Sequence, residues 1–173
     1  MYEIRLLREA DWSIVWPMLR DTFAAGDTYS FSPQSTEAEI HAVWVKAPAA
    51  TFVACDAAGA ILGTYFLKAN QPGLGDHVCN CGYVVAAGAR GKGLASLMCE
   101  HSQREALRRG FRAMQFNFVV ATNERAVRLW EKLGFAVVGR LPGVFRHQRL
   151  GFVDALVMFK TLVPAGVVYD PAP

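Results

Sequence analysis

Hydrophobic and polar residues alternate along this chain with two different periods, which predict strands and helices in turn. Tyr2 to Leu7 alternates residue by residue, as in a strand with one buried face. Apolar residues then recur at helical spacing from Trp12 to Phe23, with Asp11 placed to cap that helix and Pro17 placed to kink it. A second helix is expected to begin near residue 35 and to end before Pro48.

The middle of the chain predicts a sheet. Thr51–Cys55 and Ile61–Ala69 are rich in β-branched and aromatic residues and should form an antiparallel pair, because only a short turn separates them. His77–Val85 is expected to form the next strand. A helix that ends before Gly110 should follow, and then a fifth strand over Ala113–Val119.

The last elements predicted are an amphipathic helix and two closing strands, Ala136–Leu141 and Val153–Leu162. The full length of 173 residues suits one domain with a single core. We therefore expect one domain over residues 1–163 and a weakly ordered tail over 164–173.

Charge and hydropathy narrow the function classes. Lys and Arg exceed Asp and Glu by three, which is too small an excess for a nucleic-acid-binding surface but allows a local anion site. No apolar run reaches the roughly 18 residues of a membrane span, and charged residues interrupt the N-terminus. The expected location is the cytoplasm, with neither a membrane nor a nucleic acid as partner.

The cysteines and histidines do not predict a metal site. Cys79 and Cys81 are the one close pair of cysteines, and both fall on the same face of a predicted strand, where buried packing is expected. The four histidines are scattered along the chain, so we expect no bound metal.

A glycine-rich turn between strand and helix is the strongest chemical signal. Residues 83–99 run from an apolar strand end through Arg90-Gly91-Lys92-Gly93 into a helical pattern. Backbone N–H groups, the helix dipole and two cations would converge there on an anion. The spacing does not fit a nucleotide triphosphatase loop, since Gly93 follows the lysine, nor a dinucleotide fingerprint, since residue 96 is Ser.

A second segment, from Asn123 to Phe135, has a helix cap at Asn123, apolar residues at helical spacing and a terminating Gly134. Together the two segments resemble the GCN5-related N-acetyltransferases (GNAT family). The first carries Arg-x-x-Gly-x-Ala from Arg90 to Ala95. The second carries Asn-x-x-Ala-x-x-Leu-Trp-x-x-x-Gly-Phe.

This resemblance extends from the first strand to about Leu162 and implies an α/β (α+β) fold. The implied sheet is mixed and mostly antiparallel, with about seven strands and about four flanking helices, and it is splayed between the fourth and fifth strands. The resemblance also implies acetyl-CoA as cofactor. The cofactor-binding residues it indicates are Tyr83, Val84, Val85, Arg90, Gly91, Lys92, Gly93, Leu94, Ala95, Ser96, Asn123, Ala126 and Trp130.

Three asparagines are candidate catalytic residues: Asn80, Asn117 and Asn123. Asn is disfavoured inside strands, so its presence where the sheet should open suggests hydrogen bonding to a ligand. Their spacing resembles that of the fungal azetidine-2-carboxylate acetyltransferases. Asn80 and Asn117 are expected to face each other across the opened sheet and to bind the acceptor there. The resemblance to the GNAT family implies that the connection between the first two helices borders the acceptor pocket, which adds Asp27, Thr28, Tyr29 and Phe31 as substrate-binding candidates.

The acid and the base are not fixed by the sequence. Many relatives have a tyrosine, considered the proton donor to the thiolate, where this chain has Trp130, and an indole N–H is a hydrogen-bond donor only. Asp76, His77 and His147 are open as bases, as is a base acting through water.

The favoured function is therefore acetylation of a small-molecule amine, such as an amino acid or analogue, by an enzyme that could form a homodimer. The alternatives are acetylation of a protein N-terminus or lysine, and a catalytically silent acyl-CoA-binding module.

Overall fold

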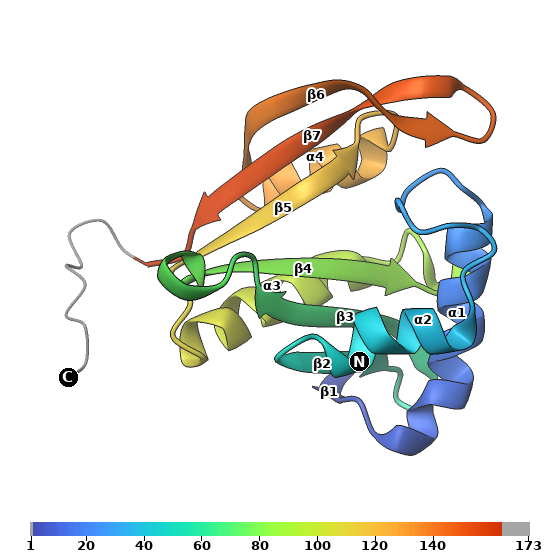
Figure 1. The fold of residues 1–173 in the computed structure, drawn as a ribbon. Coiled ribbons are helices and arrows are strands. Elements are labelled where there is room, and N and C mark those ends of the chain that lie inside the picture. Colours follow the sequence, from blue (N-terminus) through green and yellow to red (C-terminus); the bar gives the residue numbers. More distant parts are fainter. Residues whose placement is uncertain (1, 164–173) are drawn as a thin grey trace.

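A computed structural model describes residues 2–163 (Figure 1). The tail predicted over 164–173 lies outside these described residues. No helix within the described part of the chain is long and apolar enough to cross a membrane.

The centre of the fold is a seven-stranded sheet with the order β1-β2-β3-β4-β5-β7-β6. Its only parallel pair among the described strands is β4–β5, and all other neighbours are antiparallel. This confirms the predicted sheet. The strands are β1 (Glu3–Leu6), β2 (Ala50–Cys55), β3 (Ile61–Ala69), β4 (Val78–Val85), β5 (Ala113–Val120), β6 (Ala136–His147) and β7 (Gly151–Thr161).

Within residues 2–163, four α-helices flank the sheet: α1 (Trp12–Ala24), α2 (Glu37–His41), α3 (Leu94–Arg108) and α4 (Glu124–Lys132). Thr36 caps α2 in a capping box with Glu39, and the helix continues as a π-helical turn over Ala42–Lys46. The first helix runs through Pro17 without interruption.

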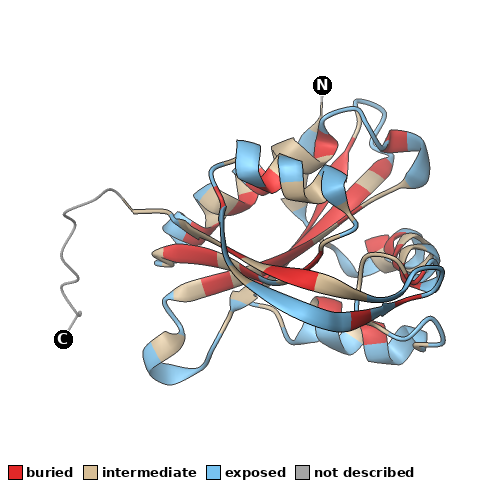
Figure 2. Ribbon diagram, turned by 90° about the horizontal axis from the view of Figure 1, so that it is seen from above, coloured by how far each residue is buried: buried red, intermediate tan, exposed pale blue. Residues whose placement is uncertain are grey.

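Successive side chains of a strand point to opposite sides of the sheet. Both faces of this sheet carry buried residues, and helices cover both. Cys79 and Cys81 of β4 are buried in a cluster with residues of α3 and α4, as their predicted packing role required. Val84 belongs instead to a cluster with residues of α1 and α2. Figure 2 shows the burial concentrated in the central strands, whereas much of the β6–β7 hairpin is exposed.

Two sequence predictions need correction. Asp11 precedes α1 but makes no side-chain capping bond to it. Its carboxylate instead accepts hydrogen bonds from the Arg5 guanidinium (2.6 and 3.0 Å) and from the Arg8 backbone N–H (2.7 Å). The Arg5 guanidinium thus binds the carboxylate in place of the helix amides. The resulting ion pair connects β1 to the residue before α1.

The second correction concerns β6, which was expected to end at Leu141 but extends to His147. Pro142 and Gly143 form an irregularity within the strand and do not end it. Asp154 of β7 stabilises this irregularity by accepting from the Gly143 N–H (3.0 Å) and pairing with Arg140 (2.6 Å). The longer hairpin contacts the loop after α1, and residues of both segments line the same pocket.

The Asp11–Arg5 pair gives a stability prediction. The hydrogen bond from Arg5 lowers the pKa of Asp11. Because this pKa is lower in the folded state, the pair stabilises the fold at pH values above the ordinary pKa of a carboxyl group. The stabilisation is lost as the pH falls through the folded-state pKa. Asp11→Asn should therefore reduce the free energy of unfolding by about 1–3 kcal/mol at pH 7.

Urea unfolding of Asp11→Asn and wild type at pH 7 and at pH 3 measures this difference, which should shrink at the lower pH. The matched control is Asp21→Asn, whose ion pair with Arg20 is exposed and should contribute little. Equal effects of both substitutions at pH 7 would contradict a structural role for Asp11.

Candidate active site

The site begins where β4 and β5 diverge. They pair only at Val78–Ala113 and Cys79–Met114, and Figure 1 shows the two strands separating beyond that point. At the next residue of each strand, the Asn80 side-chain amide donates to the backbone carbonyl of Gln115 (2.8 Å). Beyond this bridge the sheet is open.

The ladder between β3 and β4 shows which backbone groups face the opening. Asn70 N–H donates to Val78 O and Ala86 N–H donates to Leu62 O, so even-numbered residues of β4, including Val84, bond to β3. The backbone groups of Tyr83 and Val85 therefore face the gap. Of the three strand-end residues predicted to bind the cofactor, Tyr83 and Val85 direct their backbone groups into the gap, whereas those of Val84 bond to β3.

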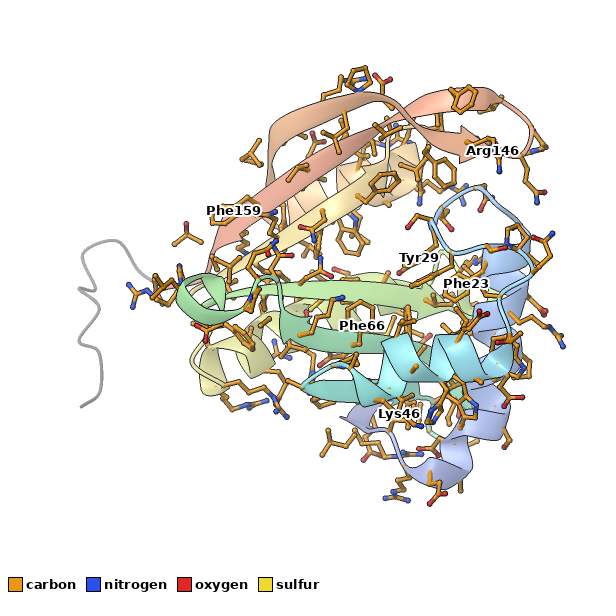
Figure 3. The ribbon with its side chains drawn as sticks, viewed as in Figure 1. Phe23, Tyr29, Lys46, Phe66, Arg146 and Phe159 are labelled. Carbon is orange, nitrogen blue, oxygen red and sulfur yellow. The ribbon has the colours of Figure 1, made fainter. Side chains whose placement is uncertain are left out.

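Tyr29 closes one end of this gap. Its hydroxyl donates to the Tyr83 carbonyl (2.8 Å), and its ring packs against Phe23 and Trp44. Figure 3 shows Tyr29 between β4 and the β6–β7 hairpin, where Arg146 is labelled. Burial raises the pKa of Tyr29, so its hydroxyl remains a protonated donor.

The predicted anion loop follows β4 directly. Gly91 and Gly93 have φ of 77° and 80°, a conformation that strongly favours glycine. The first helical turn of α3 begins after Gly93, and Leu97 is the residue whose N–H bonds back to the Gly93 carbonyl. The amides of Leu94, Ala95 and Ser96 consequently lack helical partners.

Charge and space at this loop suit an anion. Arg90 and Lys92 are exposed, and the Arg90 Nε donates to the Val85 carbonyl at the end of β4 (3.3 Å). A Cβ added at Gly91 or Gly93 would meet no atom within 4 Å. The backbone here is open to a ligand on the side of the glycines, as a pyrophosphate requires.

Helix α4 lies on the other side of the gap. Asn123 caps it, since its side-chain oxygen accepts from the Ala126 N–H (3.3 Å). Trp130 is buried and packs between Tyr83 and Phe116, with ring centroids 5.2 and 5.1 Å away. Trp130 thus packs α4 against both diverging strands.

Asn80 and Asn117 lie on the sheet face opposite α3 and α4, but they do not bond to each other. Asn117 donates to the side-chain oxygen of Asn70 (2.6 Å) and accepts from the Gln115 side chain (2.9 Å). Together with the bond from the Asn80 side chain to the Gln115 backbone carbonyl, these contacts connect the diverging strands. Whether the asparagines also bind substrate stays a prediction.

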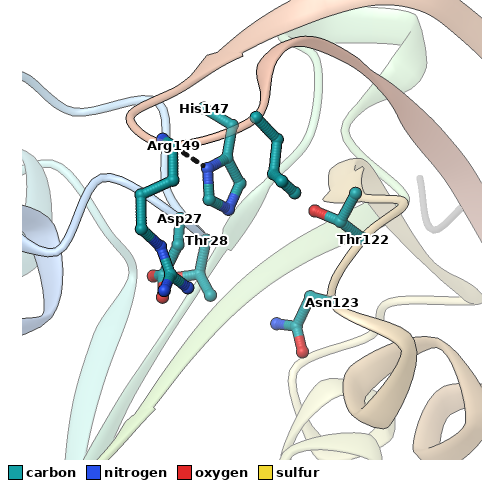
Figure 4. Close-up of a pocket in the computed structure, with 7 residues that line it drawn as sticks. Asp27, Thr28, Thr122, Asn123, His147 and Arg149 are labelled. Carbon is teal, nitrogen blue, oxygen red and sulfur yellow. Dashed lines mark hydrogen bonds between the residues drawn. The ribbon is translucent and has the colours of Figure 1, made fainter.

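A small polar pocket of about 220 Å³ lies beside the gap (Figure 4). Three segments form it: the loop after α1, the start of α4 and the β6–β7 turn. The lining residues are Asp27, Thr28, Thr122, Asn123, His147, Arg149 and Leu150. A larger neighbouring pocket of about 620 Å³ is lined in part by Tyr29 and Phe31. Of the loop residues predicted to bind substrate, Thr28 therefore lines the smaller pocket, and Tyr29 and Phe31 line the larger one.

The loop and the hairpin turn are in direct contact. Gln148 N–H donates to the Gly26 carbonyl (3.1 Å). Gly26 has φ of 59°, and a Cβ there would overlap the Gln148 side chain. Glycine at residue 26 therefore permits the close approach between the loop and the hairpin turn, which carry residues that line the pocket.

Sequence reasoning missed Thr122 and Arg149 as pocket residues and named His147 only as one open base. His147 is buried, and its Nδ1 accepts from the Arg149 backbone N–H (3.1 Å). No periodicity relates these residues to Asp27, because the contact depends on the length of β6. The described residues contain no cluster of three or more His, Cys, Asp or Glu suited to a metal ion.

Comparison with known proteins shows the family and the fold of this chain. The model of the acetyltransferase (GNAT) family matches residues 13–135. A GCN5-related N-acetyltransferase from Kribbella flavida is 40% identical, with a TM-score of 0.88, and the match covers 92% of this chain and 97% of that chain.

The N-acetyltransferase aca1 of Schizosaccharomyces pombe is 37% identical over 100 residues, which are 56% of this chain and 47% of that protein. The chain thus spans less than half the length of the curated relatives it matches. A phosphinothricin acetyltransferase from Sinorhizobium meliloti, solved in complex with AcCoA, shares the fold at 20% identity and a TM-score of 0.82, over 97% of this chain and 95% of that chain.

These matches confirm the predicted fold and agree with the acetyl-CoA-dependent enzyme class expected from the sequence. The family model spans most of the chain and includes both segments that carry the resemblance. The chain belongs to the acetyltransferase (GNAT) family.

Proposed function

We propose that this protein transfers an acetyl group from acetyl-CoA to the amine of a small molecule, namely an amino acid or analogue. The observation that carries the proposal is the small polar pocket of about 220 Å³ beside the gap between β4 and β5, with Asn123 at the start of α4 in its lining. A pocket of this size suits a compact acceptor, whereas a protein substrate requires an open groove. Acceptor and thioester would meet where the two spaces join.

The chain's own groups fit each part of the donor. The amides of Leu94, Ala95 and Ser96, with Arg90 and Lys92, would hold the pyrophosphate. Asn123, Ala126 and Trp130 border the side of the gap formed by α4. Acetyl-CoA supplies an activated acetyl thioester when bound.

The Tyr83 and Val85 amides are directed into the gap and would donate to the oxygen that becomes negatively charged during transfer. Tyr29 holds the neighbouring carbonyl and so fixes the strand end. Trp130 is not an acid, since its indole N–H donates without giving up its proton. Departure of the thiolate therefore does not depend on a residue at that position.

The two alternatives are a protein acetyltransferase and a silent acyl-CoA-binding module. Thiol release from acetyl-CoA, measured across a panel of amino acids, simple amines and peptides, distinguishes them. Turnover that rises only with small amino acids supports the proposal. Turnover with peptides alone, or tight CoA binding without any turnover, would support an alternative.

Gly93→Asp tests the cofactor loop. A carboxylate at this position should repel the pyrophosphate and lower CoA affinity by about 100-fold or more, because juxtaposed like charges cost several kcal/mol. Isothermal titration calorimetry with CoA measures the change. The matched control is Gly59→Asp in the β2–β3 turn, which has a similar φ of 84° and equally open surroundings.

Both variants carry the same backbone strain and the same added charge, so their stabilities should be similar. Only Gly93→Asp should lose CoA binding. Unchanged CoA affinity in a folded Gly93→Asp protein would exclude this loop as the cofactor site.

Asn80→Ala and Asn117→Ala test the proposed acceptor contacts. If each side chain bonds a charged group of the acceptor, its loss should cost roughly 1.5–3 kcal/mol, or about one to two decades in kcat/KM for the acceptor. The KM for acetyl-CoA should change little. Steady-state kinetics against both substrates measure this, with thermal unfolding alongside because Asn80 also bridges β4 and β5.

If both variants weaken acetyl-CoA binding but keep their efficiency towards the acceptor, the asparagines belong to the cofactor side and the substrate assignment fails.

A further inference from the structure

The imidazole of His147 is held in one orientation. The side chain is buried, and its Nδ1 accepts a hydrogen bond from the Arg149 backbone N–H (3.1 Å). A neutral imidazole whose Nδ1 accepts must carry its proton on Nε2. Figure 4 shows this second nitrogen directed away from the Arg149 amide and into the polar pocket. His147 therefore presents an N–H donor to the pocket.

This tautomer argues against a role for His147 as the base. To accept a proton, Nε2 would need a free lone pair, which in the neutral ring places the proton on Nδ1. That proton would face the Arg149 N–H and remove the observed hydrogen bond. The geometry thus favours recognition of a hydrogen-bond acceptor over abstraction of a proton.

Two further groups suit an anionic acceptor. The Arg149 guanidinium comes from the same turn and lines the same pocket, and its planar fork of donors matches a carboxylate. The Thr28 hydroxyl is buried and has no hydrogen-bond partner among the described residues. A ligand oxygen in the pocket would give it one.

The pocket also contains a carboxylate, that of Asp27. The ion pairs of the described residues include none between Asp27 and Arg149. Opposite charges that line one small pocket without pairing suit a ligand that carries both charges, as an amino acid does. Asp27 would attract the ammonium group as Arg149 attracts the carboxylate.

We propose that this pocket is the carboxylate subsite of the acceptor, in which the His147 Nε2–H and the Arg149 guanidinium bind the α-carboxylate of an amino acid. The inference rests on the proposed function and narrows it, since acceptors with a free carboxylate are selected over simple amines. The hydrogen bond from Gln148 to Gly26 fixes the turn that carries both residues.

Matched pairs of acceptors test the subsite. Each pair consists of an amino acid and its carboxamide, which keep the same amine and side chain but differ in charge. In the wild type, kcat/KM should be at least about 10-fold higher for the acid, as expected for hydrogen bonds to a charged group. Arg149→Ala should reduce this preference by about 10- to 100-fold through the acid alone, with the carboxamide little changed.

Two variants of His147 separate recognition from base catalysis. His147→Gln keeps an N–H donor and should retain part of the preference, whereas His147→Ala should lose it. Arg20→Ala on α1 is the matched control for Arg149→Ala, because it removes an exposed arginine that does not line the pocket. It should leave both acceptors unaffected.

Three results would overturn the subsite: equal efficiency of acid and carboxamide in the wild type, an equal loss for both in Arg149→Ala, or an equal loss for both in His147→Gln. Calorimetric binding of the same pairs in the presence of CoA separates this inference from the proposed function. If no acceptor is acetylated but the acid still binds better through Arg149, the subsite stands and the proposed function fails. Absence of both turnover and preferential binding contradicts both.

Discussion

The site depends on the early end of hydrogen bonding between two parallel strands. β4 and β5 pair at two positions and then separate, which leaves backbone groups of β4 without a sheet partner. Such groups are costly to bury unpaired. The Asn80 side chain bridges the first unpaired step and the Tyr29 hydroxyl satisfies the Tyr83 carbonyl. The N–H groups of Tyr83 and Val85 face the same opening and are the groups that a thioester would meet.

Packing on both faces of the sheet holds this opening in place. On one face Trp130 lies between Tyr83 and Phe116 and so joins α4 to both diverging strands. On the other face the aromatic side chains of Phe23, Tyr29 and Trp44 form a continuous cluster. A tryptophan in place of a tyrosine at residue 130 is consistent with this bracing role, because a large ring fills the space between the strands without contributing an acid.

The polar pocket illustrates how a local irregularity shapes a distant site. The pairing of β6 with β7 is irregular at Pro142 and Gly143, where Asp154 accepts a hydrogen bond from the Gly143 amide. The strand nevertheless continues as far as His147. This extra length carries the β6–β7 turn to Gly26, whose missing side chain leaves room for Gln148. The hairpin thereby brings His147 and Arg149 to a pocket shared with the loop after α1.

The sequence by itself determined the order of the elements, the anion loop at Arg90 to Ser96 and the cap of α4 at Asn123, because periodicity, positive-φ glycines and helix caps are local properties of neighbouring residues. Only the tertiary structure decided that Asp11 pairs with Arg5, that β6 passes through Pro142, and that Asp27, Asn123 and His147 line one pocket. Each of these outcomes depends on a contact between residues far apart in the chain, where a partner in space overrides the local preference. The direction of the His147 ring is the clearest case, since the hydrogen bond that orients it forms only once the turn has folded.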